Sequence, residues 1–218
     1  MADESDILFQ EVEDDLRQDK ANKLWSTYGM YIVGIAVAAV VGVASFQGWK
    51  SYDLSSRQAA GETFAAAQKL IEEQRSEEAL QAFSDISNES GGYAILARFR
   101  VAALHSSGGD LSAAIATYKT LADDSSLTPY YQDMAVILGA FVELDSNDSG
   151  VQLIEKVGTL TGETNPWRHS AREILGLSAL QSGDIGKASE YFQAITDDAT
   201  APQTIKTRTS EMLTILGG

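Results

Sequence analysis

The longest apolar run of the chain lies near its N-terminus. Residues 29–46 read GMYIVGIAVAAVVGVASF without a charged side chain, and the uncharged stretch extends from Trp25 to Trp49. A helix over 29–46 is about 27 Å long, which is close to the roughly 30 Å thickness of a bilayer's hydrocarbon core. Aromatic residues flank both ends, where their amphipathic rings favour the headgroup layer. The pattern predicts a single transmembrane helix over 25–49.

Two other interpretations of this run are a buried core helix and a cleaved signal peptide. A core helix is rarely apolar on every face. A signal peptide begins with a short basic segment, whereas residues 1–24 form a long acidic leader. We therefore expect an uncleaved anchor. Within the leader, Phe9, Val12 and Leu16 have helical spacing, which fits either an amphipathic docking helix or a frayed tail.

The charges beside the predicted span bear on its orientation. Arg17, Lys20 and Lys23 precede it, and Lys50 and Arg57 follow it. Basic residues concentrate on the cytoplasmic side of a membrane protein. The excess of three basic residues before the span over two after it therefore predicts a cytoplasmic N-terminus, with the rest of the chain beyond the span on the opposite side.

Beyond the span, the apolar pattern has a helical period and is interrupted by short breaks. Pairs of small residues recur about every 35 to 37 residues, a spacing typical of stacked helical hairpins. Two antiparallel helices can cross closely where the side chains are small. These pairs are Ala67/Ala79, Ala102/Ala114 and Gly176/Ala188, and the third unit has Gly139/Val151, in which valine stands where a small residue is expected. The fold class that this predicts is all-α, with a helical-hairpin solenoid over 53–218 and a capping helix over 203–216.

Turn residues support this division into hairpins. Gly109-Asp110 and Gly183-Asp184 have the order of a left-handed C-terminal glycine followed by an N-capping aspartate. Pro129, Pro166 and Pro202 fall between units. In the first unit Gln74-Arg75 replaces the turn glycine, and in the third Glu155 stands where Phe83, Tyr118 and Phe192 supply an aromatic ring. The third unit is therefore expected to be degenerate.

The clearest unit, ILGLSALQSGDIGKASEYFQAI, resembles the tetratricopeptide repeat. The matching residues are Leu175, Gly176, Ala179, Gly183, Ala188 and Phe192, with Ala179 in the place of the family's tyrosine.

The whole layout of acidic leader, single span and repeats is similar to the YfgM-type ancillary subunit of the bacterial SecYEG translocon. That resemblance implies a bacterial inner-membrane protein with periplasmic repeats. It also implies two partners, the SecYEG translocon and a membrane-anchored periplasmic chaperone.

Composition excludes several other classes. The chain has a net charge of −15 and no basic stripe, so nucleic acid is not an expected partner. It has no cysteine, which excludes disulfides and thiolate metal sites. No catalytic motif or phosphate-binding loop is present, so we expect no catalytic or metal-binding residues, no cofactor and no small-molecule substrate. For His105 we expect a packed imidazole, and for His169 a capping or solvated one.

Two candidate binding surfaces follow from these patterns. The first helix of each tetratricopeptide hairpin lines a groove, which would suit an apolar peptide unless flanking helices fill it. The groove residues would be Phe64, Gln68, Ile71, Phe99, Ala103, Val136, Ala140, Glu143, Leu177 and Leu180. In the span, a ridge of small residues every fourth position would allow close approach of another helix, unless it only reflects the Ala- and Gly-rich composition. That ridge consists of Gly34, Ala38 and Gly42.

The functional expectation is a membrane-anchored interaction scaffold that serves the Sec translocon and a periplasmic chaperone. The alternative is an envelope or cell-division organiser that tethers periplasmic enzymes without binding nascent chains. A mitochondrial import receptor of similar layout is disfavoured by the acidic leader, and an enzyme by the lack of a catalytic constellation.

Overall fold

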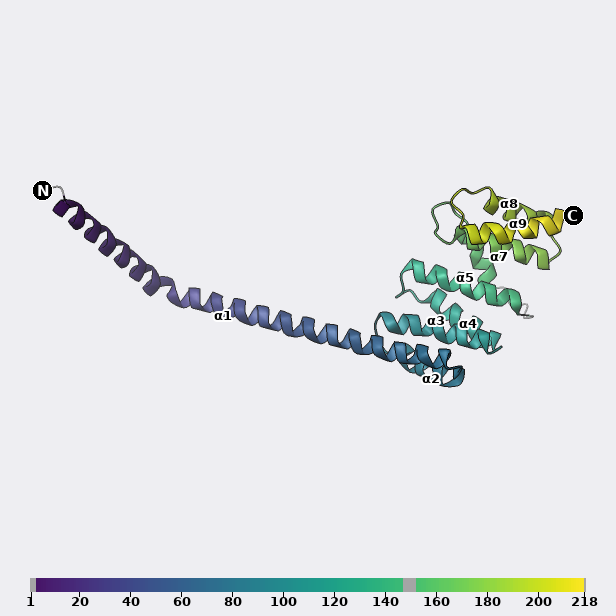
Figure 1. Cartoon of the computed structure of the whole chain (residues 1–218), viewed down its shortest axis with the longest axis horizontal. Coiled ribbons are helices and arrows are strands. Elements are labelled where there is room, and N and C mark those ends of the chain that lie inside the picture. The colour runs from purple at the N-terminus through teal and green to yellow at the C-terminus, as the bar shows by residue number, and fades with distance from the viewer. Residues whose placement is uncertain (1–2, 147–151, 218) are drawn as a thin grey trace. The chain divides into compact units, whose positions relative to one another are not determined.

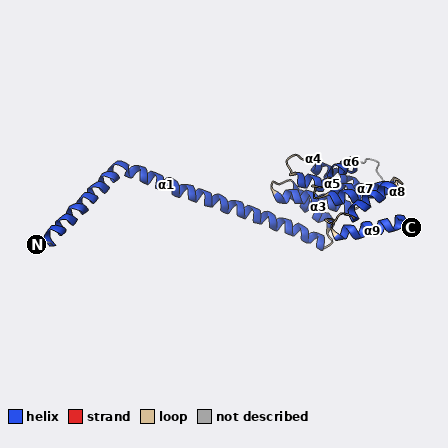
Figure 2. Cartoon of the chain, turned by 90° about the horizontal axis from the view of Figure 1, so that it is seen from above, coloured by secondary structure: helices blue, strands red, loops and turns tan. Residues whose placement is uncertain are grey.

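The structure, a computed structural model, describes the backbone of residues 3–146 and 152–217 and the side chains of 22–146 and 153–217. It consists of helices and loops, without a strand among the described residues (Figure 2). The chain divides into two compact units, Met1–Ala59 and Ala60–Gly218. This all-α architecture confirms the predicted fold class.

A single long helix, α1 (Asp3–Glu72), contains the described part of the leader, the apolar run and the first helix of the repeats. The predicted boundaries at residues 24, 49 and 53 all fall inside this helix, so they stay predictions. The side chains of Phe9, Val12 and Leu16 lie outside the described residues. Between Leu24 and Leu54 the large apolar side chains of α1 are exposed, which is the environment expected of a helix that packs against lipid.

The second unit continues with the helices from α2 to α9, which pack mainly against the helices next to them in the chain (Figure 1). Their bounds are α2 (Ser76–Ser87), α3 (Gly92–Ser107), α4 (Leu111–Asp123), α5 (Pro129–Asp145), α6 (Gln152–Val157), the short 3-10 helix η1 (Gly158–Leu160), α7 (Arg168–Gln181), α8 (Ile185–Thr196) and α9 (Gln203–Gly217).

The helix crossings have the small residues that the repeat pattern predicts. Ala188 is fully buried, and a Cβ added at Gly176 would lie 2.5 Å from Cε1 of Phe192. A Cβ at Gly139 would lie 2.7 Å from Cβ of Tyr118 and 2.4 Å from Cδ1 of Leu153. These distances are below any normal contact, so only glycine fits. The other crossing residues are buried in the same way: Ala67, Ala79, Ala102 and Ala114.

The predicted turns are also confirmed. Gly109 and Gly183 have φ values of +85° and +79°, the left-handed conformation that ends a helix. Oδ1 of Asp110 accepts a hydrogen bond from the Ala113 amide, and Oδ1 of Asp184 accepts one from Lys187, both at 3.0 Å. Each aspartate therefore caps the second helix of its hairpin.

In the first hairpin the left-handed position is occupied by Gln74, with φ of 61°. A residue with a Cβ is strained there, whereas glycine is not. We expect Gln74→Gly to raise the free energy of unfolding by roughly 1 kcal/mol. Thermal unfolding of the wild type, Gln74→Gly and the control Gln74→Ala measures this, and the control should not gain stability. A lower midpoint for Gln74→Gly would contradict the strain.

In the third hairpin the described part of the second helix is shorter than in the other hairpins. Its second helix, α6, covers only Gln152–Val157, and Val151 lies outside the described residues. Glu143, a predicted groove residue, is 6% exposed, and its carboxylate accepts hydrogen bonds from the amides of Leu153 and Ile154 at 2.9 to 3.0 Å. Glu143 thus satisfies the first amides of α6.

The last helix, α9, is fastened to α7 by a carboxylate that is almost fully buried. Glu173 on α7 accepts two hydrogen bonds from the guanidinium of Arg208 on α9, one of them at 2.7 Å. The contact raises the pKa of Arg208. Met212, Leu213 and Leu216 pack against the same terminal core as Phe192 and Ala188, so α9 covers the last hairpin.

Candidate functional site

The ten predicted groove residues differ in how far they are accessible. Phe99, Val136, Ala140 and Glu143 are buried, and the first three of them belong to the main core. Ala103 is exposed. The remaining residues are half-buried: Phe64, Gln68, Ile71, Leu177 and Leu180. The four buried residues match the alternative interpretation, in which this face of the repeats is part of the core. Peptide binding by the six accessible or half-buried residues stays a prediction.

Four exposed large apolar side chains of the repeat unit lie at other positions of the first helices, and two more, Ile185 and Ile215, lie on α8 and α9. Tyr93 and Leu96 lie on α3, and Tyr130 and Leu138 lie on α5; all four are between 37% and 53% exposed. We call these four residues the α3/α5 surface. Sequence reasoning missed it.

Two of these rings contact aromatic neighbours. The ring of Tyr93 lies 5.3 Å from that of Phe64, and Tyr130 lies 5.3 Å from Trp167. One signal could have found them, because Tyr93, Tyr130 and Trp167 are spaced by 37 residues, the repeat period.

A group of cationic side chains lies where the start of α7 meets the loop between α8 and α9. Oδ2 of Asp198 is 3.5 Å from Nε of Arg168, 3.5 Å from Nη1 of Arg172 and 3.8 Å from Nε2 of His169. Oδ1 of Asp198 accepts hydrogen bonds from the hydroxyl and the amide of Thr200. These bonds, helped by the nearby cations, lower the pKa of Asp198 to about 2.

His169 is buried among these charges. It is 5% exposed, and within the described part of the chain neither ring nitrogen has a hydrogen-bond partner. The expectation of a capping or solvated histidine is therefore wrong, because α7 and the α8–α9 loop enclose the ring. Burial lowers the pKa of His169, and the positive charges of Arg168, Arg172 and Lys206 lower it further, against the opposing effect of Asp198.

This depressed pKa predicts a pH dependence of stability. The unfolded His169 takes up a proton near its ordinary pKa of about 6.5, while the folded one resists protonation. Stability should therefore fall as the pH drops below about 6.5 and level off once the folded pKa is passed. Urea unfolding at a series of pH values tests this. His169→Gln should flatten the curve in that range, and an unchanged slope would contradict the assignment.

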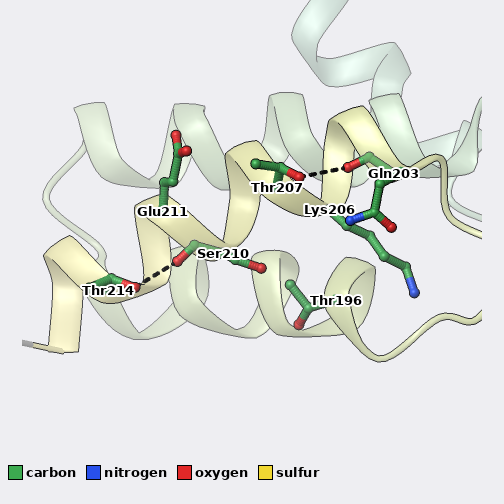
Figure 3. A pocket seen from close by; sticks show the side chains of 7 residues that line it. All are labelled: Thr196, Gln203, Lys206, Thr207, Ser210, Glu211 and Thr214. Carbon is green, nitrogen blue, oxygen red and sulfur yellow. Dashed lines mark hydrogen bonds between the residues drawn. The ribbon is translucent and has the colours of Figure 1, made fainter.

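The C-terminal helix also forms one wall of a polar pocket of about 420 Å³. Figure 3 shows that its lining comes from one side of α9, with Thr196 of α8 facing it. The hydroxyls of Thr207 and Thr214 already donate to backbone carbonyls of α9. The lining residues are Thr196, Gln203, Lys206, Thr207, Ser210, Glu211 and Thr214.

In the first unit, the span is the candidate membrane site. The only described helix that is long and apolar enough to cross a membrane is the Asn22–Glu72 part of α1, and just 6% of its most apolar window is buried. A soluble core helix would be mostly buried. The predicted ridge is open, since a Cβ added at Gly34 or Gly42 would meet no side chain of the described residues within 4 Å. No metal-binding cluster of His, Asp or Glu side chains occurs among the described residues.

Comparison with known proteins shows which family has this arrangement of helices. The model of the tetratricopeptide repeat-like domain matches residues 22–213. The chain belongs to this family. Neither a curated protein nor a solved structure matches it significantly.

Membership of the tetratricopeptide repeat-like family indicates the general kind of function that the repeats have. Tetratricopeptide-like helical repeats are typically non-catalytic scaffolds for protein–protein interaction. The matched region begins at residue 22 and so takes in the apolar helix as well as the hairpins. The candidate spanning helix is consistent with a single-pass membrane protein of this family.

Proposed function

We propose that this tetratricopeptide repeat-like protein is a membrane-anchored scaffold that works beside the SecYEG translocon and assists a periplasmic chaperone acting on exported chains. The observation that supports it best is the extent of the family match, which includes the apolar helix and the repeats together. The scaffold is non-catalytic and needs no cofactor. Its repeats lie in the periplasm of a bacterium, and its N-terminus lies in the cytoplasm.

The α3/α5 surface is the proposed contact for the exported chain. Tyr93, Leu96, Tyr130 and Leu138 offer apolar area with only partial exposure, which suits transient contact with an unfolded segment. The half-buried groove residues Phe64 and Leu177 would add apolar area, whereas Phe99 and Val136 are buried in the core. In the span, the ridge of Gly34, Ala38 and Gly42 is the proposed docking face for a membrane partner.

Photo-crosslinking from the α3/α5 surface tests this function. A photoreactive amino acid at Tyr130 should crosslink to newly exported chains in intact cells. The same amino acid at Ala116, which is exposed on α4, serves as the control and should crosslink much less. Crosslinks from Tyr130 to a fixed set of envelope enzymes, with no exported chain among them, would instead support the envelope organiser.

Topology provides a separate test. A reporter that is active only in the cytoplasm, fused after Gly218, should be silent, because basic residues before the span favour a cytoplasmic N-terminus. Full activity of this fusion would overturn the periplasmic role.

A further inference from the structure

The second and fourth repeats contain the same local arrangement of an aspartate and an arginine, two repeat lengths apart. Asp124 and Asp198 each follow the second helix of a hairpin, and each accepts hydrogen bonds from the amide and hydroxyl of the residue two positions on. An arginine of the first helix faces each carboxylate, Arg98 in the second repeat and Arg172 in the fourth. The sequence offset is 74 residues for both pairs, twice the period of 37.

In the second repeat a single cation, Arg98, pairs with the aspartate. Nη1 of Arg98 donates directly to Oδ2 of Asp124 at 3.1 Å. The position equivalent to Lys206 is Gln132, whose amide donates to the backbone carbonyl of Asp124 at 2.7 Å. The positions equivalent to Arg168 and His169 are uncharged residues, Ala94 and Ile95. One arginine therefore suffices to hold the hairpin to its loop.

In the fourth repeat the same carboxylate faces a surplus of positive charge. Arg168 and Arg172 both approach Oδ2 of Asp198 at 3.5 Å, and within the described part of the chain neither donates a hydrogen bond to it. Lys206, on the pocket-lining side of α9, is close enough to His169 to affect its pKa. Two permanent cations thus share one carboxylate and a third, Lys206, lies near His169, although the whole chain has a charge of −15.

These cations can be reached from solvent. The side chains of Arg168 and Arg172 are each 18% exposed, that of Asp198 is 22% exposed, and Lys206 borders an open polar pocket. Each guanidinium has five N–H donors, more than its contacts here use. Beneath them, Nε2 of the buried and unpartnered His169 points toward the same Asp198 oxygen. An incoming acceptor would find several donors already converging.

From this arrangement we propose that Arg168, Arg172 and Lys206, around Asp198 and His169, form a binding site for a carboxylate of an acidic peptide. Asp198 is the internal occupant and shows which chemistry the site accepts, because a carboxylate on a peptide already lies among the cations. An external carboxylate binds beside Asp198 or replaces it. This site uses other residues than the α3/α5 surface, and it does not depend on the assignment to protein export.

Peptide binding by the full-length chain in a non-ionic detergent tests the proposal. The probe is a fluorescently labelled oligo-aspartate, and anisotropy is measured at low and high salt. We expect binding that weakens with salt, because the site is partly exposed. An oligo-asparagine of the same length should not bind. Inorganic phosphate at equal charge should compete poorly, and competition as strong as that of unlabelled oligo-aspartate would overturn the assignment to peptide carboxylates.

Variants separate a ligand site from a structural clamp. Arg172→Gln and Lys206→Gln should each weaken binding about tenfold, the effect of losing one charged hydrogen bond. The matched control is Arg98→Gln in the second repeat, which should bind as the wild type does. Asp198→Asn should bind several-fold more tightly, because the competing internal carboxylate is gone. If the charged cluster only stabilises the fold, no variant should bind the peptide more tightly than the wild type.

Several results would overturn the proposal. They are absent binding to the wild type, equal weakening by Arg98→Gln, or weaker binding by an Asp198→Asn variant whose circular dichroism is unchanged. If Asp198→Asn fails to fold, Lys206→Gln decides alone. The side chain of Lys206 makes no hydrogen bond or ion pair within the described residues, so its loss should leave the fold intact.

Discussion

Replacing Phe192 with Ala should lower the free energy of unfolding of the repeat unit by about 3 to 5 kcal/mol. The ring of Phe192 is fully buried between the crossing at Gly176 and the capping helix α9. Its removal leaves a cavity, because the two helices that flank it are already in contact. Urea unfolding of a fragment beginning at residue 53 measures the change. Glu190→Ala, an exposed change on the same helix, should alter stability by less than about 0.5 kcal/mol.

The contact between Phe192 and Gly176 can be tested on its own with a double-mutant cycle. Gly176→Ala alone should destabilise by roughly 1 to 3 kcal/mol, since the new methyl group would overlap the Phe192 ring. In a Phe192→Leu background the smaller side chain leaves room for that methyl group. The two changes together should then cost less than the sum of the single changes. Additive effects would show that the ring and the glycine are not in contact.

Much of the fold could be predicted from the sequence because its constraints are local. A helix crossing needs a small residue at a fixed place, so Gly176 and Ala188 identify the hairpin from the chain alone. Gly183 and Asp184 likewise mark a turn through their own backbone preferences. Gln74 is an exception, because it has the left-handed backbone that its own side chain disfavours.

The candidate sites were harder to predict, because they depend on which faces of the helices remain uncovered. Helical periodicity places Val136 and Ala140 on the first-helix face, but it does not reveal that neighbouring residues bury them. Glu143 was assigned to the groove, although its carboxylate caps α6, a role that only the tertiary structure reveals. The cations near Asp198 and His169 come from α7 and α9, where Arg172 and Lys206 are 34 residues apart in sequence.

The continuity of α1 has a similar origin. The sequence between the span and the first repeat helix contains neither proline nor a pair of glycines, so nothing local ends the helix there. Hydropathy defines the ends of a membrane segment, whereas backbone hydrogen bonding defines the ends of a helix. The predicted membrane segment therefore covers 25–49, whereas the helix that contains it covers Asp3–Glu72.

Replacing Ala38 with Leu should abolish co-purification of the membrane partner while leaving the protein inserted in the membrane. Gly34, Ala38 and Gly42 recur every fourth residue and so lie along one side of α1, and among the described residues no side chain would contact a Cβ added at either glycine. Helices in lipid associate mainly by close packing, for which small residues are needed. A leucine in the middle of the ridge would hold the two backbones apart.

The matched control is Ala39→Leu, which adds the same side chain about 100° around the helix. Leucine favours insertion at either position, so both variants should fractionate with the membrane and keep folded repeats. Affinity purification in a mild detergent followed by mass spectrometry then compares the partners recovered. Loss of the same partners from Ala38→Leu alone would locate docking on the ridge. Equal recovery from both variants would mean that the ridge reflects an Ala- and Gly-rich composition, and that the leader or the repeats hold the partner instead.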